Sequence, residues 1–411
     1  GKGMQRLRAL LGTAAAVLIV ALLAGAFVMK THSTPGQTNN GQGGSPASSA
    51  GCAPNQITAR LPARSFLNDL AMISPKEGWA VGSVLDANSG PANMLIAHYQ
   101  NCAWTPIATD DPGMTLMSVS MTSASDGWAV GGSSDGKPLA LHYTGGAWQP
   151  VALPGEDRRD GVYDLVRMRS ADEGWIALMR SKDQQGLLSQ SLFHLANGRW
   201  SPVNPPFAMI NDILPVGPND AWIAGYVSDG QQSPVLYHYQ AGKWTSVTLP
   251  HGVVVDQLRM TSPNDIWASG HISAPSHDDR MQQAAVLRYD GSEWRQVSVT
   301  ASGHPQFVQA FDSATSWAFT LDSSFNADDS ISGAQYQHGG SWQTIAWPFK
   351  DTGLGFVSLG MNPIQRVAPD EFWAIGWDNG ARQPNTNGGT ASASVTVLLY
   401  FANGAWHEYG Q

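Results

Sequence analysis

Residues 121–154 read MTSASDGWAVGGSSDGKPLALHYTGGAWQPVALP, and the same pattern recurs with variations along the chain. An Asp-Gly turn signal precedes an apolar run that begins at Trp128, and a second run ends in His142-Tyr143. A Gly-Gly turn follows, and a third run begins at Trp148. With the short apolar run at 116–122, this stretch predicts a unit of four strands joined by turns.

Two tryptophans mark each copy of this unit. The first recurs at intervals of 45 to 56 residues, close to the period of propeller blades, as Trp79, Trp128, Trp175, Trp222, Trp267, Trp317 and Trp373. The second recurs as Trp104, Trp148, Trp200, Trp244, Trp294, Trp342 and Trp406. Because this rule accounts for 14 of the 16 tryptophans, we count seven units built on one plan.

The repeat has a physical reason. One four-stranded sheet cannot bury both of its faces alone, whereas sheets stacked around a common axis cover each other. The sequence therefore predicts an all-β fold, a seven-bladed β-propeller of four-stranded blades over residues 52–411. The blades are expected at about 66–112, 113–156, 161–206, 207–250, 252–300, 304–348 and 356–411.

The Trp-Ala-Val-Gly strands at 79–82 and 128–131, and the Tyr-x-x-x-x-Trp hairpins, carry a family resemblance. In these motifs residues 66 to 411 resemble the bacterial kelch-like propellers. The second unit has the kelch Gly-Gly doublet at 131–132, whereas the other units have one glycine or none at this place. The resemblance implies a propeller fold and says little about activity.

The amino-terminal part has a different composition. Residues 9–29 form an apolar run without a charge, long enough to cross a bilayer as a helix. Basic side chains precede the run, so the positive-inside rule places residues 1–8 in the cytoplasm and the propeller outside. Residues 30–51 are rich in Gly, Ser and Asn and are expected to form a flexible linker. We therefore expect a single-pass bacterial cell-membrane protein with an extracellular propeller. The alternative is a cleaved signal peptide.

The charge balance excludes one class of partner. Charged side chains make up only 13% of the chain, and its formal net charge is -9. Phosphate binding needs clustered Lys and Arg, and the repeats contain no such cluster. We therefore expect no nucleic-acid partner.

Cys52 and Cys102 are the only two cysteines. An even count on the outer side of a membrane favours one disulfide, which would tie the segment before the first blade to the last hairpin of that blade. The alternative is two unrelated thiols. After Cys52, residues 56–62 have the pattern of an extra edge strand that helps to close the ring.

The innermost strands can be aligned on the first tryptophan of each blade. The position nine residues before it is always apolar, while the positions eight and ten residues before it are mixed. Because side chains alternate along a strand, the mixed rows are expected to face the central channel. They offer the candidate ligand-binding residues Asp69, Arg167, Asp212, Gln257 and Arg259. The alternative is that these groups pair with each other and with water.

A second variable row lies four residues after each first tryptophan, on the face that carries the longest loops. Those loops are expected at 86–91, 181–187, 271–281, 322–332 and 378–393. Function in propellers is concentrated in such loops. The row adds Tyr226, His271 and Trp377 as candidates, because an aromatic ring can stack on a sugar or an apolar group. The alternative is packing within the loops.

Catalytic and metal motifs are not found in the sequence. It contains no nucleophile elbow, phosphate loop or zinc spacing. The recurring His98, His142, His194 and His238 belong to separate blades, so they cannot converge on one ion. The cluster at 277–279, His-Asp-Asp, offers ligands for a divalent ion, but a solvated acidic loop is the simpler interpretation. We expect no catalytic residue, no metal and no cofactor.

These expectations combine into one functional hypothesis. The chain is predicted to be a membrane-tethered recognition, scaffold or sensor module that binds a protein or carbohydrate ligand through its long-loop face. The alternative is a glycan-active hydrolase or lyase, which requires a pair of carboxylates from different blades.

Overall fold

The computed structural model describes residues 51–86, 90–107, 111–133, 135–155, 164–180, 189–227, 233–272, 283–321, 331–348, 354–356, 364–378 and 395–410. The membrane helix predicted for residues 9–29 lies outside these ranges, as does the predicted linker apart from Gly51. Within the ranges, no helix is long and apolar enough to cross a membrane.

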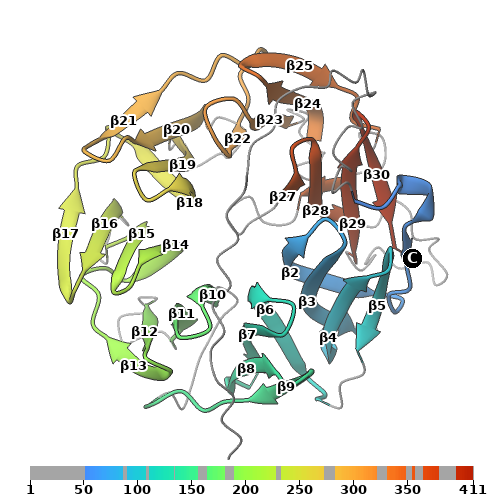
Figure 1. Ribbon diagram of the computed structural model, residues 1–411, viewed down its shortest axis with the longest axis vertical. Coiled ribbons are helices and arrows are strands. Elements are labelled where there is room, and N and C mark those ends of the chain that lie inside the picture. The colour runs from blue at the N-terminus through green and yellow to red at the C-terminus, as the bar shows by residue number, and fades with distance from the viewer. Residues whose placement is uncertain are drawn as a thin grey trace, which may run out of the picture. The chain divides into compact units, whose positions relative to one another are not determined.

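The described residues form seven sheets, or blades, arranged in a ring (Figure 1). Blade 1 contains β1 (Thr58–Ala59), β2 (Ser65–Ser74), β3 (Glu77–Leu85), β4 (Pro91–Gln100) and β5 (Ala103–Ile107). Blade 2 contains β6 (Met114–Ser123), β7 (Asp126–Ser133), β8 (Pro138–Thr144) and β9 (Ala147–Pro150). Blade 3 contains β10 (Leu165–Ser170), β11 (Glu173–Met179), β12 (Gln190–Ala196) and β13 (Arg199–Val203). Blade 4 contains β14 (Met209–Gly217), β15 (Asp220–Tyr226), β16 (Pro234–Gln240) and β17 (Lys243–Val247).

Three blades complete the ring. Blade 5 contains β18 (Val253–Ser262), β19 (Asp265–Ile272), β20 (Gln283–Tyr289) and β21 (Trp294–Val297). Blade 6 contains β22 (Phe307–Ala310), β23 (Ser316–Leu321), β24 (Ile331–His338) and β25 (Ser341–Ile345). Blade 7 contains β26 (Leu354–Phe356), β27 (Ile364–Ala368), β28 (Glu371–Asp378), β29 (Val395–Ala402) and β30 (Ala405–Tyr409). The prediction of an all-β propeller with seven four-stranded blades is confirmed.

Blades 2 to 6 share one topology. Their strands pair in chain order with antiparallel neighbours, and the first strand of each blade lies nearest the ring axis (Figure 1). Blade 7 divides this inner strand into two pieces, because β26 and β27 both pair with β28. Blade 1 gains a fifth strand at its outer edge, where β1 pairs with β5 in parallel.

The core of the described chain lies between the blades. Its buried apolar residues form seven clusters, and each cluster joins the facing sides of two adjacent blades. The tryptophan repeat has its explanation there. Trp79 of blade 1 packs edge-on against Trp148 of blade 2, with ring centroids 5.5 Å apart, and Trp128 packs in the same way against Trp200 of blade 3. The two repeated tryptophans therefore seal the same kind of junction between successive blades.

A glycine fixes the shape of four inner strands. A Cβ atom on Gly82, Gly131, Gly225 or Gly270 would lie 1.9–2.1 Å from a carbonyl oxygen of the inner strand. In each of these blades the glycine pairs with a residue of the inner strand. The register between the two strands shifts by one residue directly after this pair, at a β-bulge. Blades 3 and 6 have Leu and Thr at this position, and their inner strands begin only after the bulge position. Glycine is thus required where the inner strand continues past the bulge.

Residues 51–62, the amino-terminal strap, cross the junction between blades 7 and 1. The amide of Gly51 donates to Glu371 Oε2 at 2.9 Å in blade 7, and Tyr409 OH donates to the carbonyl of Pro54 at 2.8 Å. Farther along, β1 pairs with β5, and Cys52 forms a disulfide with Cys102. The short 3-10 helix η1 (Pro54–Gln56) lies between these contacts. Because blade 7 consists wholly of carboxy-terminal strands, the ring closes by packing, and the strap covers its last junction.

Candidate functional site

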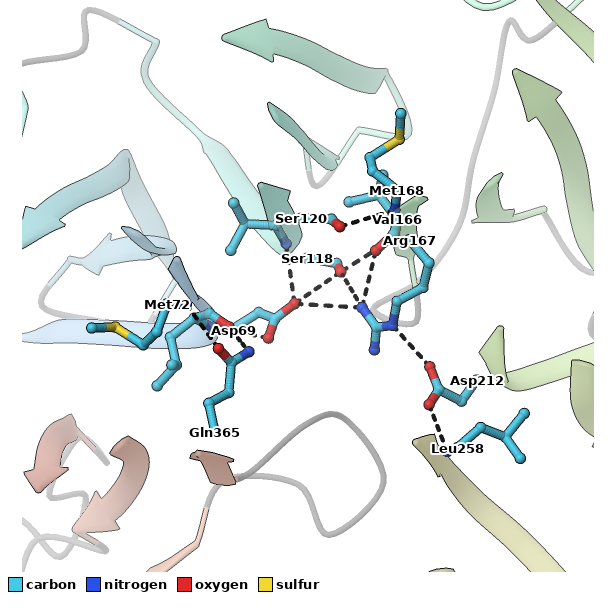
Figure 2. Close-up of polar contacts among 12 residues, drawn as sticks. Asp69, Met72, Ser118, Ser120, Val166, Arg167, Met168, Asp212, Leu258 and Gln365 are labelled. Atoms are coloured by element: carbon cyan, nitrogen blue, oxygen red, sulfur yellow. Dashed lines mark hydrogen bonds and ion pairs between the residues drawn. The ribbon is translucent and has the colours of Figure 1, made fainter. Parts of the chain in front are cut away.

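The inner strands carry the candidate site toward the ring axis. Each inner strand begins at the face with the long loops and ends at the turn that leads to the second strand. This turn has two residues in every blade except blade 6, where it spans 311–315. The polar residues predicted to face the channel lie in the middle of these strands, and Figure 2 draws the contacts of Asp69, Arg167 and Asp212.

Asp69 and Ser118 join the first three blades. Ser118 Oγ of blade 2 donates to Asp69 Oδ2 of blade 1 at 2.9 Å, and the backbone amide of Val119 donates to the same oxygen at 3.1 Å. Ser118 Oγ in turn accepts from the amide of Val166 in blade 3 at 3.2 Å. Both polar side chains are buried. Each therefore replaces the water that the amide of the next blade loses on folding.

Arg167 continues this chain of contacts to blade 4. Its Nε donates to Asp212 Oδ1 at 2.9 Å, and its Nη1 donates to Ser118 Oγ at 3.3 Å and lies 3.9 Å from Asp69 Oδ2 (Figure 2). Asp212 Oδ2 accepts from the amide of Leu258 in blade 5 at 2.9 Å and lies 3.6 Å from Arg259 Nη1. The two acids and two arginines are thus held in one ion-paired network.

Polar side chains also span the three remaining junctions. Ser269 Oγ of blade 5 accepts from the amide of Ala310 in blade 6 at 2.9 Å. Gln309 Nε2 of blade 6 donates to the carbonyl of Ile364 in blade 7 at 2.8 Å. Gln365 Oε1 of blade 7 accepts from the amide of Met72 in blade 1 at 2.8 Å. Each junction of the ring is therefore crossed near the axis by a polar side chain.

We call this set the polar belt, and its members are Asp69, Ser118, Arg167, Asp212, Ser269, Gln309 and Gln365. Four of the predicted channel residues pair with each other, as the alternative interpretation expects. They are Asp69, Arg167, Asp212 and Arg259. Their contact with a ligand stays a prediction. Gln257 is also buried, and its amide has no hydrogen-bond partner among the described residues.

Burial shapes the electrostatics of the belt. Withdrawal from water raises the pKa of Asp69 to about 6, although Arg167 and the hydrogen bonds from Val119 and Ser118 oppose the rise. Desolvation likewise lowers the pKa of Arg259 from its ordinary value, and the neighbouring Asp212 carboxylate counteracts this. A guanidinium nevertheless stays protonated in proteins, so Arg259 keeps its charge.

A cavity of about 310 Å³ lies on the channel side of the belt. Its lining residues are Ala71, Met72, Val119, Ser120, Met121, Arg167, Arg259, Phe311, Ile364, Gln365 and Arg366. The strand residues among them belong to the half of the inner strands that leads into the two-residue turns. The described concavity is therefore at the end of the channel opposite the long loops.

Solvent reaches the arginines of this cavity. The side chains of Arg167, Arg259 and Arg366 are 12%, 24% and 31% exposed, whereas those of Asp69 and Asp212 are only 3% and 1% exposed. Arg366 Nη1 donates to Asp312 at 2.7 Å. The cavity is thus lined by guanidinium groups, and the carboxylates that pair with them are not among its lining residues.

Several residues of this site were missed at the sequence level. Ser118, Gln309 and Gln365 occupy the mixed rows but were not among the candidates, although Gln257 of the same rows was. Ser269 lies on the second strand of its blade, and Phe311 and Arg366 fall outside the aligned rows. An alignment extended to the positions seven and six residues before each tryptophan would have included Arg366 and Phe311.

The second predicted row is only partly brought together. His271 Nδ1 lies 2.8 Å from Asp256 Oδ2, and burial raises the pKa of Tyr226, with the Asp256 carboxylate as a second cause. Tyr226 of blade 4 and His271 of blade 5 thus share one acid at the long-loop end. Trp377 pairs with Gly355 and belongs to blade 7, three blades from Tyr226 and two from His271. Most of the long loops lie outside the described residues, so binding at that face stays a prediction.

The recurring histidines have a packing role. In blades 1 to 4 a histidine of the third strand stacks on the first tryptophan, with ring centroids 3.9–4.3 Å apart. The acid two residues before that tryptophan lies 2.6–3.4 Å from histidine Nε2. In blade 5, Arg288 takes the place of the histidine over Trp267 and pairs with Asp265. Within the described ranges no group of three His, Cys, Asp or Glu side chains is placed to hold a metal ion. The cluster at 277–279 lies outside them.

No family model matches the sequence, and no curated relative matches it either. Solved structures do share the fold. YCF48 bound to a D1 peptide has a TM-score of 0.50 and 15% identity, with 86% of this chain and 98% of that chain covered. The β-propeller domain of the Trilobed protease from Pyrococcus furiosus has a TM-score of 0.52 and 8% identity, with 84% and 98% covered.

A third solved structure, acylaminoacyl peptidase in complex with a chloromethyl ketone, has a TM-score of 0.53 and 7% identity. The likeness covers 84% of this chain and 52% of that chain. At these identities the likenesses establish the propeller fold alone. None of the three names points to kelch proteins, so the kelch resemblance stays a prediction.

Proposed function

We propose that this propeller is a recognition module, acting as a scaffold or sensor, and that it binds a protein or carbohydrate ligand. One observation carries the proposal, namely the cavity of about 310 Å³ on the channel axis, lined by three arginines beside apolar side chains. A concave, partly apolar site with a few convergent polar groups is the usual form of a ligand site.

The belt favours recognition over catalysis at this site. A catalytic carboxylate must reach its substrate and exchange a proton with it. Asp69 Oδ2 and Asp212 Oδ2 instead accept backbone amides at 3.1 and 2.9 Å, and both side chains are buried behind arginines. Neither carboxylate lines the cavity. The glycan-active alternative therefore gains no support from the charges of the channel.

The solved neighbours are compatible with this proposal. The YCF48 propeller holds a peptide, which demonstrates that a ring of this fold can bind one. Because that likeness rests on 15% identity, it supports the class of function by fold analogy and assigns no residue here.

A direct test uses the immobilised full chain on a peptide array and a glycan array. We expect one class of probe to be retained without chemical change, and Arg366→Gln in the cavity to weaken retention while the circular-dichroism spectrum stays that of the folded propeller. Release of a cleaved product would instead support the enzyme alternative. Loss of retention in the double variant Tyr226→Ala and Trp377→Ala, with retention by Arg366→Gln intact, would move the ligand to the long-loop face that the sequence predicts.

We further propose that residues 9–29 anchor the protein in a bacterial cell membrane, with the propeller on the outer side. The sequence alone supports this, through the length of the apolar run and the basic residues before it. In cell fractionation the full chain should sediment with membranes after carbonate washing, and deletion of 9–29 should release it. Protease added to intact spheroplasts should digest the propeller. A full chain that stays in the soluble fraction would contradict the anchor.

A further inference from the structure

The cavity has a more specific chemistry than recognition in general. We propose that it binds an organic carboxylate that carries an apolar body, with the arginines of blades 3, 5 and 7 holding the carboxylate. This inference rests on the proposed function, because it names the ligand class of the same site.

The arginines offer donors on three sides of the cavity. Arg167, Arg259 and Arg366 come from blades 3, 5 and 7, and all three line it. A guanidinium has five N–H donors and no acceptor, so it matches a group that only accepts. Arg167 donates through Nε and Nη1, and Arg366 donates through Nη1, which leaves Nη2 of both side chains without a partner among the described residues. A carboxylate can accept from two such donors at once.

The acids behind the arginines fix their orientation. Asp212 accepts from Arg167 Nε at 2.9 Å, and Asp312 accepts from Arg366 Nη1 at 2.7 Å. Because each guanidinium is planar, a partner on one edge holds the opposite edge in place. Preorganised donors lose less conformational entropy when the ligand binds than free surface arginines would.

The remaining walls select for an apolar body. Met72 and Met121 lie on the side of blades 1 and 2, and Phe311 lies on the side of blade 6. Methionine sulfur and a phenyl ring both make favourable contacts with an aromatic group. Inorganic phosphate would satisfy the arginines but would leave these walls uncovered. A volume of about 310 Å³ accommodates a small organic acid.

The test measures binding of 3-phenylpropionate to the full chain by isothermal titration calorimetry. The neutral isostere 3-phenylpropanamide has the same shape without the charge. Its affinity should be lower by about tenfold or more, because a charge-assisted hydrogen bond is lost. Arg366→Gln should weaken binding of the acid by about tenfold. The matched control Arg295→Gln removes one positive charge from β21, far from the axis, and should leave binding unchanged.

Each other outcome has a defined meaning. Equal binding of the acid and the amide would overturn the carboxylate assignment, and inorganic phosphate that binds as tightly as 3-phenylpropionate would overturn the apolar body. If Arg366→Gln fails to fold, Arg366→Lys is the second variant, because it keeps the charge and removes the planar fork. A loss of the difference in affinity between 3-phenylpropionate and 3-phenylpropanamide in Arg366→Lys would still support the inference. A probe retained on the arrays in an Arg366-dependent manner, but not displaced by 3-phenylpropionate, would refute this inference and leave the proposed function standing.

Discussion

At the scale of single residues, Asp69 is the belt member whose protonation matters most. Its pKa is raised to about 6 because it is buried, so the folded protein binds this proton more tightly than the unfolded chain does. The contribution of Asp69 to stability is therefore fully present below the ordinary aspartate pKa of 3.8 and is lost as the pH rises through about 6.

Asp69→Asn should flatten this part of the pH profile. The amide keeps an acceptor for Val119 but does not titrate. Between about pH 4 and pH 7 the unfolding free energy of each protein changes, and the two changes should differ by up to about 3 kcal/mol. Chemical denaturation at several pH values measures it. Parallel profiles for the two proteins would show that Asp69 titrates as it does in water.

Arg167 is expected to be the most sensitive arginine. Arg167→Met leaves the buried carboxylate of Asp212 with Arg259 at 3.6 Å as its remaining cationic partner, and we expect a loss of about 3 kcal/mol in unfolding free energy. Adding Asp212→Asn should recover part of the loss, because it removes the uncompensated charge and keeps an acceptor for Leu258. The exposed Arg295→Met should cost less than about 0.5 kcal/mol. Additive losses in the double variant would argue against the ion-paired network.

At the scale of elements, the glycine three residues after the first tryptophan decides the length of the inner strand. Gly131→Ala would bring a Cβ atom to 2.1 Å from the carbonyl oxygen of Thr115. We expect a destabilisation of about 3 kcal/mol, since two backbones must separate. Gly217→Ala is the matched control, because its Cβ would meet only Asp220 Cβ at 3.4 Å. Thermal unfolding of both variants checks the difference, and equal melting temperatures would remove the bulge argument.

The elements also explain how far the sequence could predict the site. The row nine residues before the tryptophans is buried in every blade, as its apolar residues predict, because strand alternation is local. The mixed rows do not all face the channel, since Leu165 and Phe307 lie in the clusters between blades. The partners could not be predicted, since Asp69 meets Ser118 49 residues away and Arg167 meets Asp212 45 residues away. Glu173 likewise pairs with His194 of the neighbouring strand, 21 residues along the chain. Only the register of the sheet brings such side chains together.

At the scale of the whole molecule, the ring itself was the most predictable feature. The paired tryptophans recur because Trp79 meets Trp148 across a junction, and this contact repeats between blades. The closure was less predictable. The segment at 56–62 was expected to help close the ring as an edge strand, and its β1 does pair with β5, but the inner strands of blade 7 are all carboxy-terminal. The pattern of an edge strand does not reveal which blade it joins.

The disulfide should contribute to the stability of the whole ring. Cys52 and Cys102 are 50 residues apart, and closing a loop of this length stabilises the folded state by about 4 kcal/mol in the chain-entropy account. Replacing both cysteines with Ser should lower the melting temperature and abolish its response to a reductant, whereas the wild type should lose stability in dithiothreitol. Alkylation under non-reducing conditions should find no free thiol. Two alkylated cysteines in the untreated protein would refute the bond.

The strap has a mechanical consequence. A pull on the chain ahead of Cys52 passes through two sulfur atoms to Cys102 and leaves residues 53–101 outside the loaded path. The tension then enters blade 1 at the turn before β5, the strand that β1 joins at the outer edge of that blade. A pull from this side is therefore carried first by a covalent bond at the rim and not by the hydrogen bonds of the inner strands.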